Sequence, residues 1–135
     1  MNLKSVATTK PSAAPRDGQA LTELAIVLPL LIILVLGAVD FGRLFYAFQS
    51  VESAAAAGAQ FACLNSSNAG NSDMIRSNAL AQASDIANLS PAVTNSISGS
   101  NVSVTVSATF NTLIAWPGMP HTVPLQRTVN MRILQ

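Results

Sequence analysis

The stretch Leu24–Val39, which contains no charged side chain, constrains this chain more than any other feature. As a helix it would be roughly 24 Å long at about 1.5 Å per residue. The hydrocarbon core of a bilayer is about 30 Å thick. Residues 20–22 extend the apolar stretch at one end, and the other end is extended by Phe41, Leu44, Phe45, Tyr46 and Phe48. The sequence therefore predicts one membrane-spanning helix, with Asp40 and Arg43 near the far interface.

The composition separates this segment from the rest of the chain. Half of the 135 residues are apolar, 10% are charged, and the mean hydropathy is +0.42. That is too apolar for an ordinary soluble domain of this size. The remainder is rich in Ser, Asn, Thr and Ala, which indicates a small polar domain tethered to the apolar helix. A net charge of +1 without a basic stripe excludes a nucleic-acid interface.

The charges on either side of the apolar stretch predict its orientation. Residues 1–17 read as a mildly basic, irregular leader, in which three cations are offset by Asp17 alone. The cations are Lys4, Lys10 and Arg16, and the charges that follow the stretch are Asp40, Arg43 and Glu52. Because the more basic flank of a span stays in the cytoplasm, we expect a cytoplasmic N-terminus and a domain outside.

The helix is expected to continue beyond the membrane, from Ala20 to about Cys63, a length of roughly 65 Å. An apolar stripe at helical spacing supports this; it comprises Phe41, Leu44, Phe45, Phe48, Val51, Ala55, Ala59 and Ala62. Ala54, Gly58 and Ala62 form small-xxx-small pairs that allow another helix to approach closely. An equally good interpretation is that alanine simply favours helix.

The C-terminal half predicts one further helix and two strands. A loop over residues 65–72 precedes a helix capped by Ser72 or Asp73 and ended by Pro91. Its apolar face would be Ile75, Ala79, Ala83, Ile86 and Leu89. Residues 101–110 and 122–133 alternate apolar and polar side chains, as strands do. The first apolar face is Val102, Val104, Val106, Ala108 and Phe110; the second is Val123, Leu125, Val129, Met131 and Ile133, with Arg127 as the exception.

Two strands alone are marginally stable, so the second helix and the outer half of the first should cover their apolar face. The predicted class is α+β, with a long N-terminal membrane-spanning helix continuing into a small domain that has a second helix and a short antiparallel sheet. The expected organisation is a leader over residues 1–18, the long transmembrane and assembly helix over 19–64, and an extracytoplasmic domain over 65–135.

The chain shows no pattern typical of catalysis. His121 is the only histidine and has no Cys or carboxylate near it in sequence, there is no glycine-rich phosphate loop, and the acidic residues are scattered. We expect no enzyme activity, no metal, no cofactor and no small-molecule substrate. Cys63 is the single cysteine, which rules out an internal disulfide, and burial is its expected state.

The segment before the apolar stretch reads Gly18-Gln-Ala-Leu-Thr-Glu23-Leu. A signal peptide would be cleaved after the apolar stretch, where Val35-Leu-Gly37 is a poor site. A glycine followed by an apolar helix with glutamate as its fifth residue is instead the arrangement of type IV prepilins. The stretch GQALTELAIVLPLLIILVLGAVDFGRLFYAFQSVESAAAAGAQFA resembles the TadE-like branch of tight-adherence (Tad/Flp) pilus systems.

The resemblance implies a minor pilin or pseudopilin of the bacterial inner membrane, taking part in pilus assembly and surface adhesion. A prepilin peptidase would cut between Gly18 and Gln19, and Glu23 would serve subunit assembly. The implied partners are that peptidase, other pilin-like subunits and the Tad assembly machinery. One alternative is a generic single-span envelope protein with a small extracytoplasmic binding domain, whose chain would stay uncleaved from Met1. The other, an enzyme or a conventionally secreted factor, would need a catalytic cluster or cleavage near Gly37.

Overall fold

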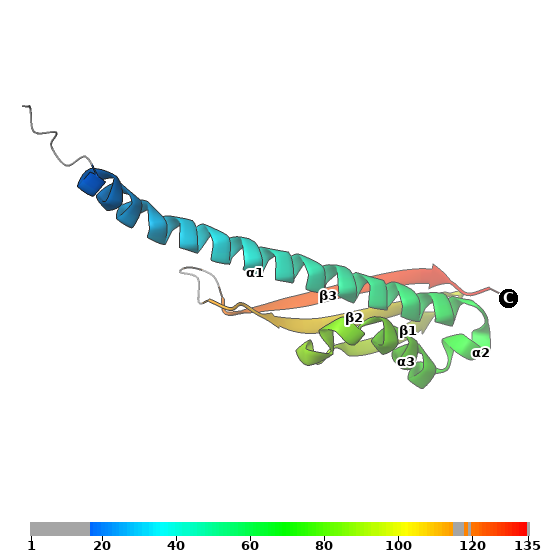
Figure 1. Ribbon diagram of the computed structural model, residues 1–135. Helices are drawn as coiled ribbons and strands as arrows, with labels where there is room; N and C mark the ends of the chain where they lie inside the picture. Colours follow the sequence, from blue (N-terminus) through cyan, green and yellow to red (C-terminus); the bar gives the residue numbers. More distant parts are fainter. Residues whose placement is uncertain (1–16, 115–117, 119, 135) are drawn as a thin grey trace, which may run out of the picture. The chain divides into compact units, whose positions relative to one another are not determined.

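The computed structural model describes residues 17–114, 118 and 120–134 (Figure 1). Residues 1–16 of the predicted leader, including Lys4, Lys10 and Arg16, lie outside the described residues. The chain divides into two compact units, residues 1–37 and 38–135. Helix α1, Asp17–Cys63, contributes to both units. We describe each unit by itself.

The described part of the first unit is the N-terminal half of α1. Its apolar side chains are exposed from Leu21 onward, and no polar stripe interrupts them. Pro29 lies inside the helix. Proline removes one backbone donor from a helix, a loss that membrane-spanning helices tolerate.

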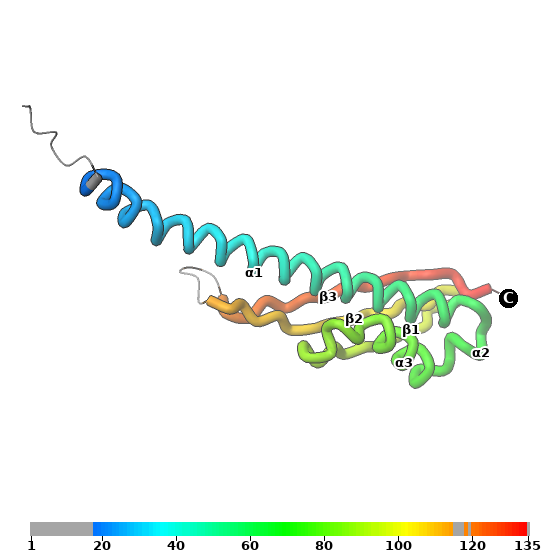
Figure 2. The backbone as a smooth tube through the Cα atoms, in the orientation of Figure 1, coloured from blue at the N-terminus to red at the C-terminus, as the bar shows by residue number. Residues whose placement is uncertain are grey.

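The second unit joins the C-terminal part of α1 to an antiparallel sheet. After α1 come the short helices α2 (Ser66–Ala69) and α3 (Ser72–Gln82) and the 3-10 helix η1 (Ser84–Leu89). The strands are β1 (Ala92–Ser98), β2 (Asn101–Asn111) and β3 (Thr122–Arg132), in the spatial order β1-β2-β3. The tube in Figure 2 shows how the chain returns along β2 and β3.

The predicted alternation in β2 is confirmed, and it places the core. Val102, Val104 and Val106 are completely buried on one face, whereas the serines and threonines between them lie on the opposite face. Val104 stands opposite Asn95 of β1 and Val129 of β3. One face of the sheet is therefore covered, as expected for a strand that shows one face to water.

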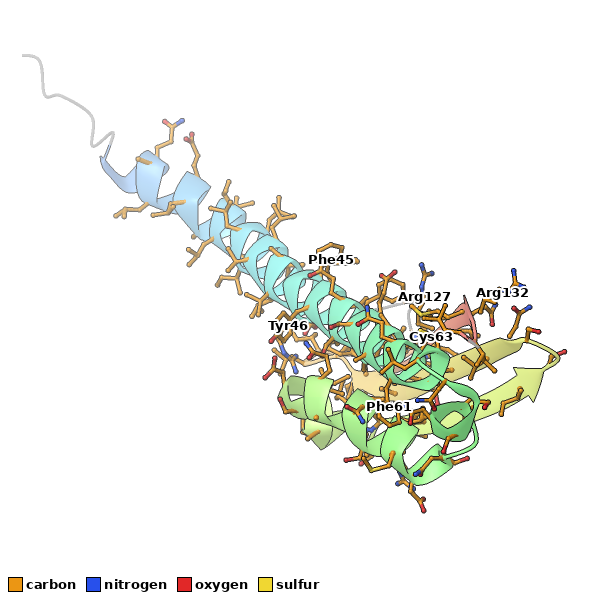
Figure 3. The ribbon with its side chains drawn as sticks, turned by 90° about the vertical axis from the view of Figure 1, so that its right-hand side faces the viewer. Phe45, Tyr46, Phe61, Cys63, Arg127 and Arg132 are labelled. Carbon is orange, nitrogen blue, oxygen red and sulfur yellow. The ribbon has the colours of Figure 1, made fainter. Side chains whose placement is uncertain are left out.

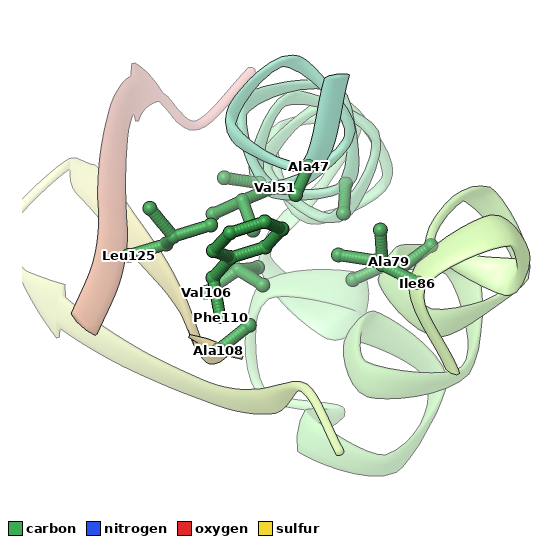
Figure 4. Packing of buried hydrophobic residues seen from close by; sticks show 11 residues of the cluster. Ala47, Val51, Ala79, Ile86, Val106, Ala108, Phe110 and Leu125 are labelled. Carbon is green, nitrogen blue, oxygen red and sulfur yellow. The ribbon is translucent and has the colours of Figure 1, made fainter. Parts of the chain in front are cut away.

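The cover comes from both α1 and α3, as the sequence predicted. Val51 of α1, Ala79 of α3 and Ile86 of η1 belong to one buried cluster with Phe110 of β2 and Leu125 of β3 (Figure 4). A second cluster nearer the end of α1 contains Ala59, Ala62, Ile75, Val102 and Val104. Burying a Val, Leu, Ile or Phe side chain stabilises a fold by about 1.5–3 kcal/mol, so these clusters hold the domain together.

Four local details differ from the sequence prediction. Asn71, not Ser72 or Asp73, caps α3, because its side-chain oxygen accepts the backbone N–H of Met74 at 3.1 Å. The second helix ends at Gln82 and continues as η1. The expected loop contains one helical turn, α2, and a third strand, β1, joins β2 through a turn in which Gly99 has φ +59°.

Arg127, the exception in the β3 pattern, does not enter the core. Its guanidinium lies 5.9 Å from the centre of the Phe48 ring, and its Nη2 donates to Glu52 Oε1 at 3.0 Å. Both partners belong to α1. The arginine thus links β3 to α1 at the rim of the core (Figure 3).

Candidate functional site

The first two turns of α1 carry Gly18, Gln19 and Glu23, the three residues on which the pilin hypothesis depends. Gln19 Nε2 donates to Glu23 Oε1 at 3.1 Å, and Thr22 Oγ1 donates to the carbonyl oxygen of Gly18 at 2.9 Å. Gly18, Gln19 and Glu23 are all exposed. The nearest described partner of the Glu23 carboxylate is thus a neutral amide one helical turn away on the same helix.

Gly18 has no structural reason to be glycine among the described residues. A Cβ placed there would meet no atom within 4 Å, and the residue is not among those with positive φ. Alanine would favour helix by about 1 kcal/mol at an interior position. Among the described residues, packing thus gives no reason for a glycine at position 18.

After Glu23, the surface of α1 is apolar on all sides as far as Val39. Ile26 is 73% exposed, Leu34 is 61% exposed, and neighbouring leucines and valines behave alike. A helix that is hydrophobic all round is normally buried in a large core or in a bilayer. In length and composition α1 is a helix that could cross a membrane. Such a surface needs lipid or other apolar helices around it.

Asp40 lies at the start of the second unit, where it joins α1 to the end of β2. The residue is 4% exposed. Its Oδ1 accepts the backbone N–H of Leu113 at 3.1 Å and lies 3.3 Å from Arg43 Nη1. The Arg43 guanidinium also lies 5.3 Å from the centre of the Phe110 ring. A carboxylate that leaves water needs such donors, because an unpaired buried charge is costly.

Sequence reasoning placed Asp40 near a membrane interface but missed this role. Leu113 is 73 positions away along the chain, so no local pattern could pair the two. The one available signal was the acidic residue itself, which stands between an apolar stretch and an aromatic cluster and would need partners if the domain covered it.

The predicted packing residues Ala54, Gly58 and Ala62 lie against the domain's own sheet and helix. Ala54 and Ala62 are completely buried. A Cβ at Gly58 would come within 3.1 Å of Val104 Cγ1 and 3.3 Å of Ala79 Cβ. The glycine thus lets β2 and α3 approach α1 more closely than a larger residue would allow.

The polar side chains of the second unit make structural pairs. Tyr46 Oη donates to Asp85 Oδ2 at 2.7 Å, and Thr112 Oγ1 lies 2.8 Å from His121 Nδ1. Cys63 is half-buried, and its thiol donates to the carbonyl oxygen of Gln60 at 3.2 Å. Within the described ranges, no three His, Cys, Asp or Glu residues gather in a way that could hold a metal ion.

The comparison with family models identifies the same segment as the residue pattern. Residues 18–60 match the family described as TadE-like protein, which confirms the resemblance of this segment. The match begins at the predicted cleavage site and ends within α1, so it covers the first turns of α1, the apolar stretch and the alanine-rich segment as far as Gln60. No curated protein and no solved structure shows a significant match to the chain.

Proposed function

We propose that this protein is a membrane-anchored, TadE-like minor pilin or pseudopilin that takes part in Tad/Flp-type pilus assembly and surface adhesion. The observation that carries the proposal is the juxtaposition of Gly18 and Glu23 with a helix whose apolar surface is exposed on all sides. The TadE-like match over residues 18–60 supports it independently of exposure. The role is structural, in that α1 supplies the anchor and the second unit supplies an outward-facing surface.

In this proposal residues 19–64 form the transmembrane and assembly helix of a single-pass protein in the bacterial inner membrane. The leader, residues 1–18, is removed by a prepilin peptidase, and residues 65–135 lie outside the cytoplasm. The outer half of α1 forms part of the core of that domain, since Val51 and Ala55 are completely buried in it. The partners are other pilin-like subunits and the Tad machinery.

The first test concerns processing. Gly18→Val should prevent cleavage, because the branched side chain keeps a peptidase from the backbone of the Gly18–Gln19 bond. The intact mass of protein extracted from membranes should correspond to a chain that begins at Gln19 in the wild type and at Met1 in the variant. Gly18→Ala adds one methyl group where the structure is open, so it serves as the matched control and should retain more cleavage. A wild-type mass equal to all 135 residues would instead favour a generic single-span envelope protein.

The second test concerns orientation. A reporter that is active only outside the cytoplasm, fused after Gln135, should be active. Replacing Lys4, Lys10 and Arg16 with glutamine removes the charge that holds the leader inside and should reduce this activity. Activity confined to a reporter that works only in the cytoplasm would contradict the proposed orientation.

A further inference from the structure

The second unit has exposed apolar side chains at Asp40, the residue that follows the apolar stretch: two lie just after it on α1, and one belongs to the residue whose backbone N–H it accepts. Phe41 and Phe45 are each 63% exposed, and Leu113 is 61% exposed. We call these three residues the membrane-proximal rim. Phe45 lies on a different side of α1 from Tyr46, which is bonded to Asp85 (Figure 3). The side chains of the rim therefore do not belong to the core of the domain.

The Asp40 hydrogen bond fixes where the β2–β3 connection begins. Asp40 is the first charged residue after the uncharged stretch, and its Oδ1 accepts the backbone N–H of Leu113. Leu113, two residues after the end of β2, is therefore held beside Asp40. Phe41 is the next residue, and Phe45 follows one turn later, about 6 Å along the axis. All three rim residues therefore lie within a few ångströms to one helical turn of the point where α1 loses its apolar character.

The polar neighbour of the rim also suits a bilayer surface. The Arg43 side chain is 42% exposed although its Nη1 is paired with Asp40, so solvent still reaches part of this side chain. Guanidinium groups bind phosphate oxygens in paired geometry. Aromatic side chains are enriched at the level of lipid headgroups. Apolar and aromatic groups flanked by a partly open arginine match the boundary between acyl chains and phosphates.

We propose that the membrane-proximal rim inserts into the interfacial region of the bilayer that α1 crosses, so that the domain contacts the membrane through Leu113, just after β2, as well as through α1. This inference depends on the proposed membrane anchor, and it goes beyond it by giving the domain a second lipid contact. The partner is a phospholipid surface, not another protein chain.

The test uses single-cysteine variants of the full chain. In a Cys63→Ser background, Leu113→Cys is labelled with a polarity-sensitive fluorophore, and the protein is reconstituted into phosphatidylcholine and phosphatidylglycerol vesicles. Lipids carrying a nitroxide near the headgroup end of the acyl chain act as quenchers. The label at position 113 should shift its emission to the blue and lose much of its intensity to the lipid quencher. The exposed side chain makes this substitution mild, and the Asp40 bond uses only the backbone of residue 113.

Two matched labels separate the possible failures. Ser98→Cys, exposed at the opposite end of the sheet, should show neither effect. Leu30→Cys, within the apolar stretch, should be quenched by lipid if α1 crosses the bilayer. If position 30 is quenched and position 113 behaves like position 98, the rim inference is wrong while the anchor stands. If the label at position 30 is quenched by aqueous iodide and not by lipid, both the membrane anchor and the rim inference are wrong. A label at 113 that is shielded from aqueous iodide but not reached by the lipid quencher shows a protein partner and also overturns the inference.

Discussion

Replacing Glu23 with alanine should leave membrane insertion and cleavage intact but abolish recovery of the protein in complexes with other pilin-like subunits. In the proposed function, cleavage after Gly18 would create a free ammonium on Gln19 at the membrane edge. A carboxylate from a neighbouring helix would neutralise it and fix the offset between the two helices. Favourable interaction with the helix dipole contributes only ~0.3–1 kcal/mol, whereas an acidic side chain costs ~2.5–3.5 kcal/mol at the bilayer centre and less toward its edge.

The geometry of the single chain sharpens this expectation. The Glu23 carboxylate accepts from the neutral Gln19 amide at 3.1 Å, an exposed bond that adds little stability. Pairing Glu23 with the ammonium of its own chain would fray the first helical turn. The carboxylate is therefore better matched to the ammonium of a second subunit.

Co-purification of tagged and untagged copies, or of a partner pilin, from detergent-solubilised membranes measures the effect. Glu23→Gln keeps the shape of the side chain without its charge and should also fail, while Glu23→Asp should be intermediate because its stem is shorter. Gln19→Ala removes the intrachain amide but keeps the new ammonium, so it should assemble. Assembly of Glu23→Ala at the wild-type level would leave only the helix-dipole role.

Val104→Asp should unfold the second unit. Val104 is completely buried at the centre of β2, and its Cγ1 would lie 3.1 Å from a Cβ at Gly58. An aspartate at this position would be out of contact with water and would have no space for its carboxylate. We therefore expect the free energy of unfolding to fall by more than about 4 kcal/mol, a loss that few single substitutions cause. The total free energy of unfolding of a folded protein is about 5–15 kcal/mol, so this single change would remove much or all of the stability of the second unit.

Thr105→Asp is the matched control, one residue along the same strand. Thr105 lies on the other face, where its hydroxyl is 2.8 Å from that of Thr128. Losing this exposed hydrogen bond should cost about 0.5–1.5 kcal/mol. Circular dichroism of the detergent-solubilised full chain, followed through a denaturant titration, compares the two variants. Equal destabilisation would contradict the strand orientation.

The parts of the fold that follow from local periodicity were predictable. The uncharged stretch predicted the long helix, and the alternation of β2 and β3 predicted which of their side chains face the core. The structure confirms both, although on β3 only Leu125 is buried and the other apolar members of that face are half-buried. Strand β1 escaped prediction because its pattern is broken by polar residues: Asn95 is half-buried while Ile97 is 49% exposed. The signal that could have found it was Gly99, whose left-handed conformation suits the turn that joins β1 to β2.

The candidate site divides in the same way. Gly18, Gln19 and Glu23 could be selected from the sequence because the pilin-like pattern is defined by their spacing along one helix. The role of Asp40 depends on a backbone donor in a distant loop, and the role of Arg127 depends on Phe48 and Glu52 across the core. Contacts of this kind join segments more than seventy positions apart, and single-sequence patterns do not contain them.

The position of the core stripe within α1 has a consequence for the order of folding. Val51 and the buried alanines of α1 are synthesised before every residue that covers them. Strand β2 needs β3 as its partner on one side, and β3 comes after α1, α3 and β2 in the chain. Contacts of such long sequence separation slow folding. The newly made chain must therefore keep the alanine-rich face of α1 incompletely covered until β3 has been made, and during that interval this face is open to chaperones and to premature association with other chains.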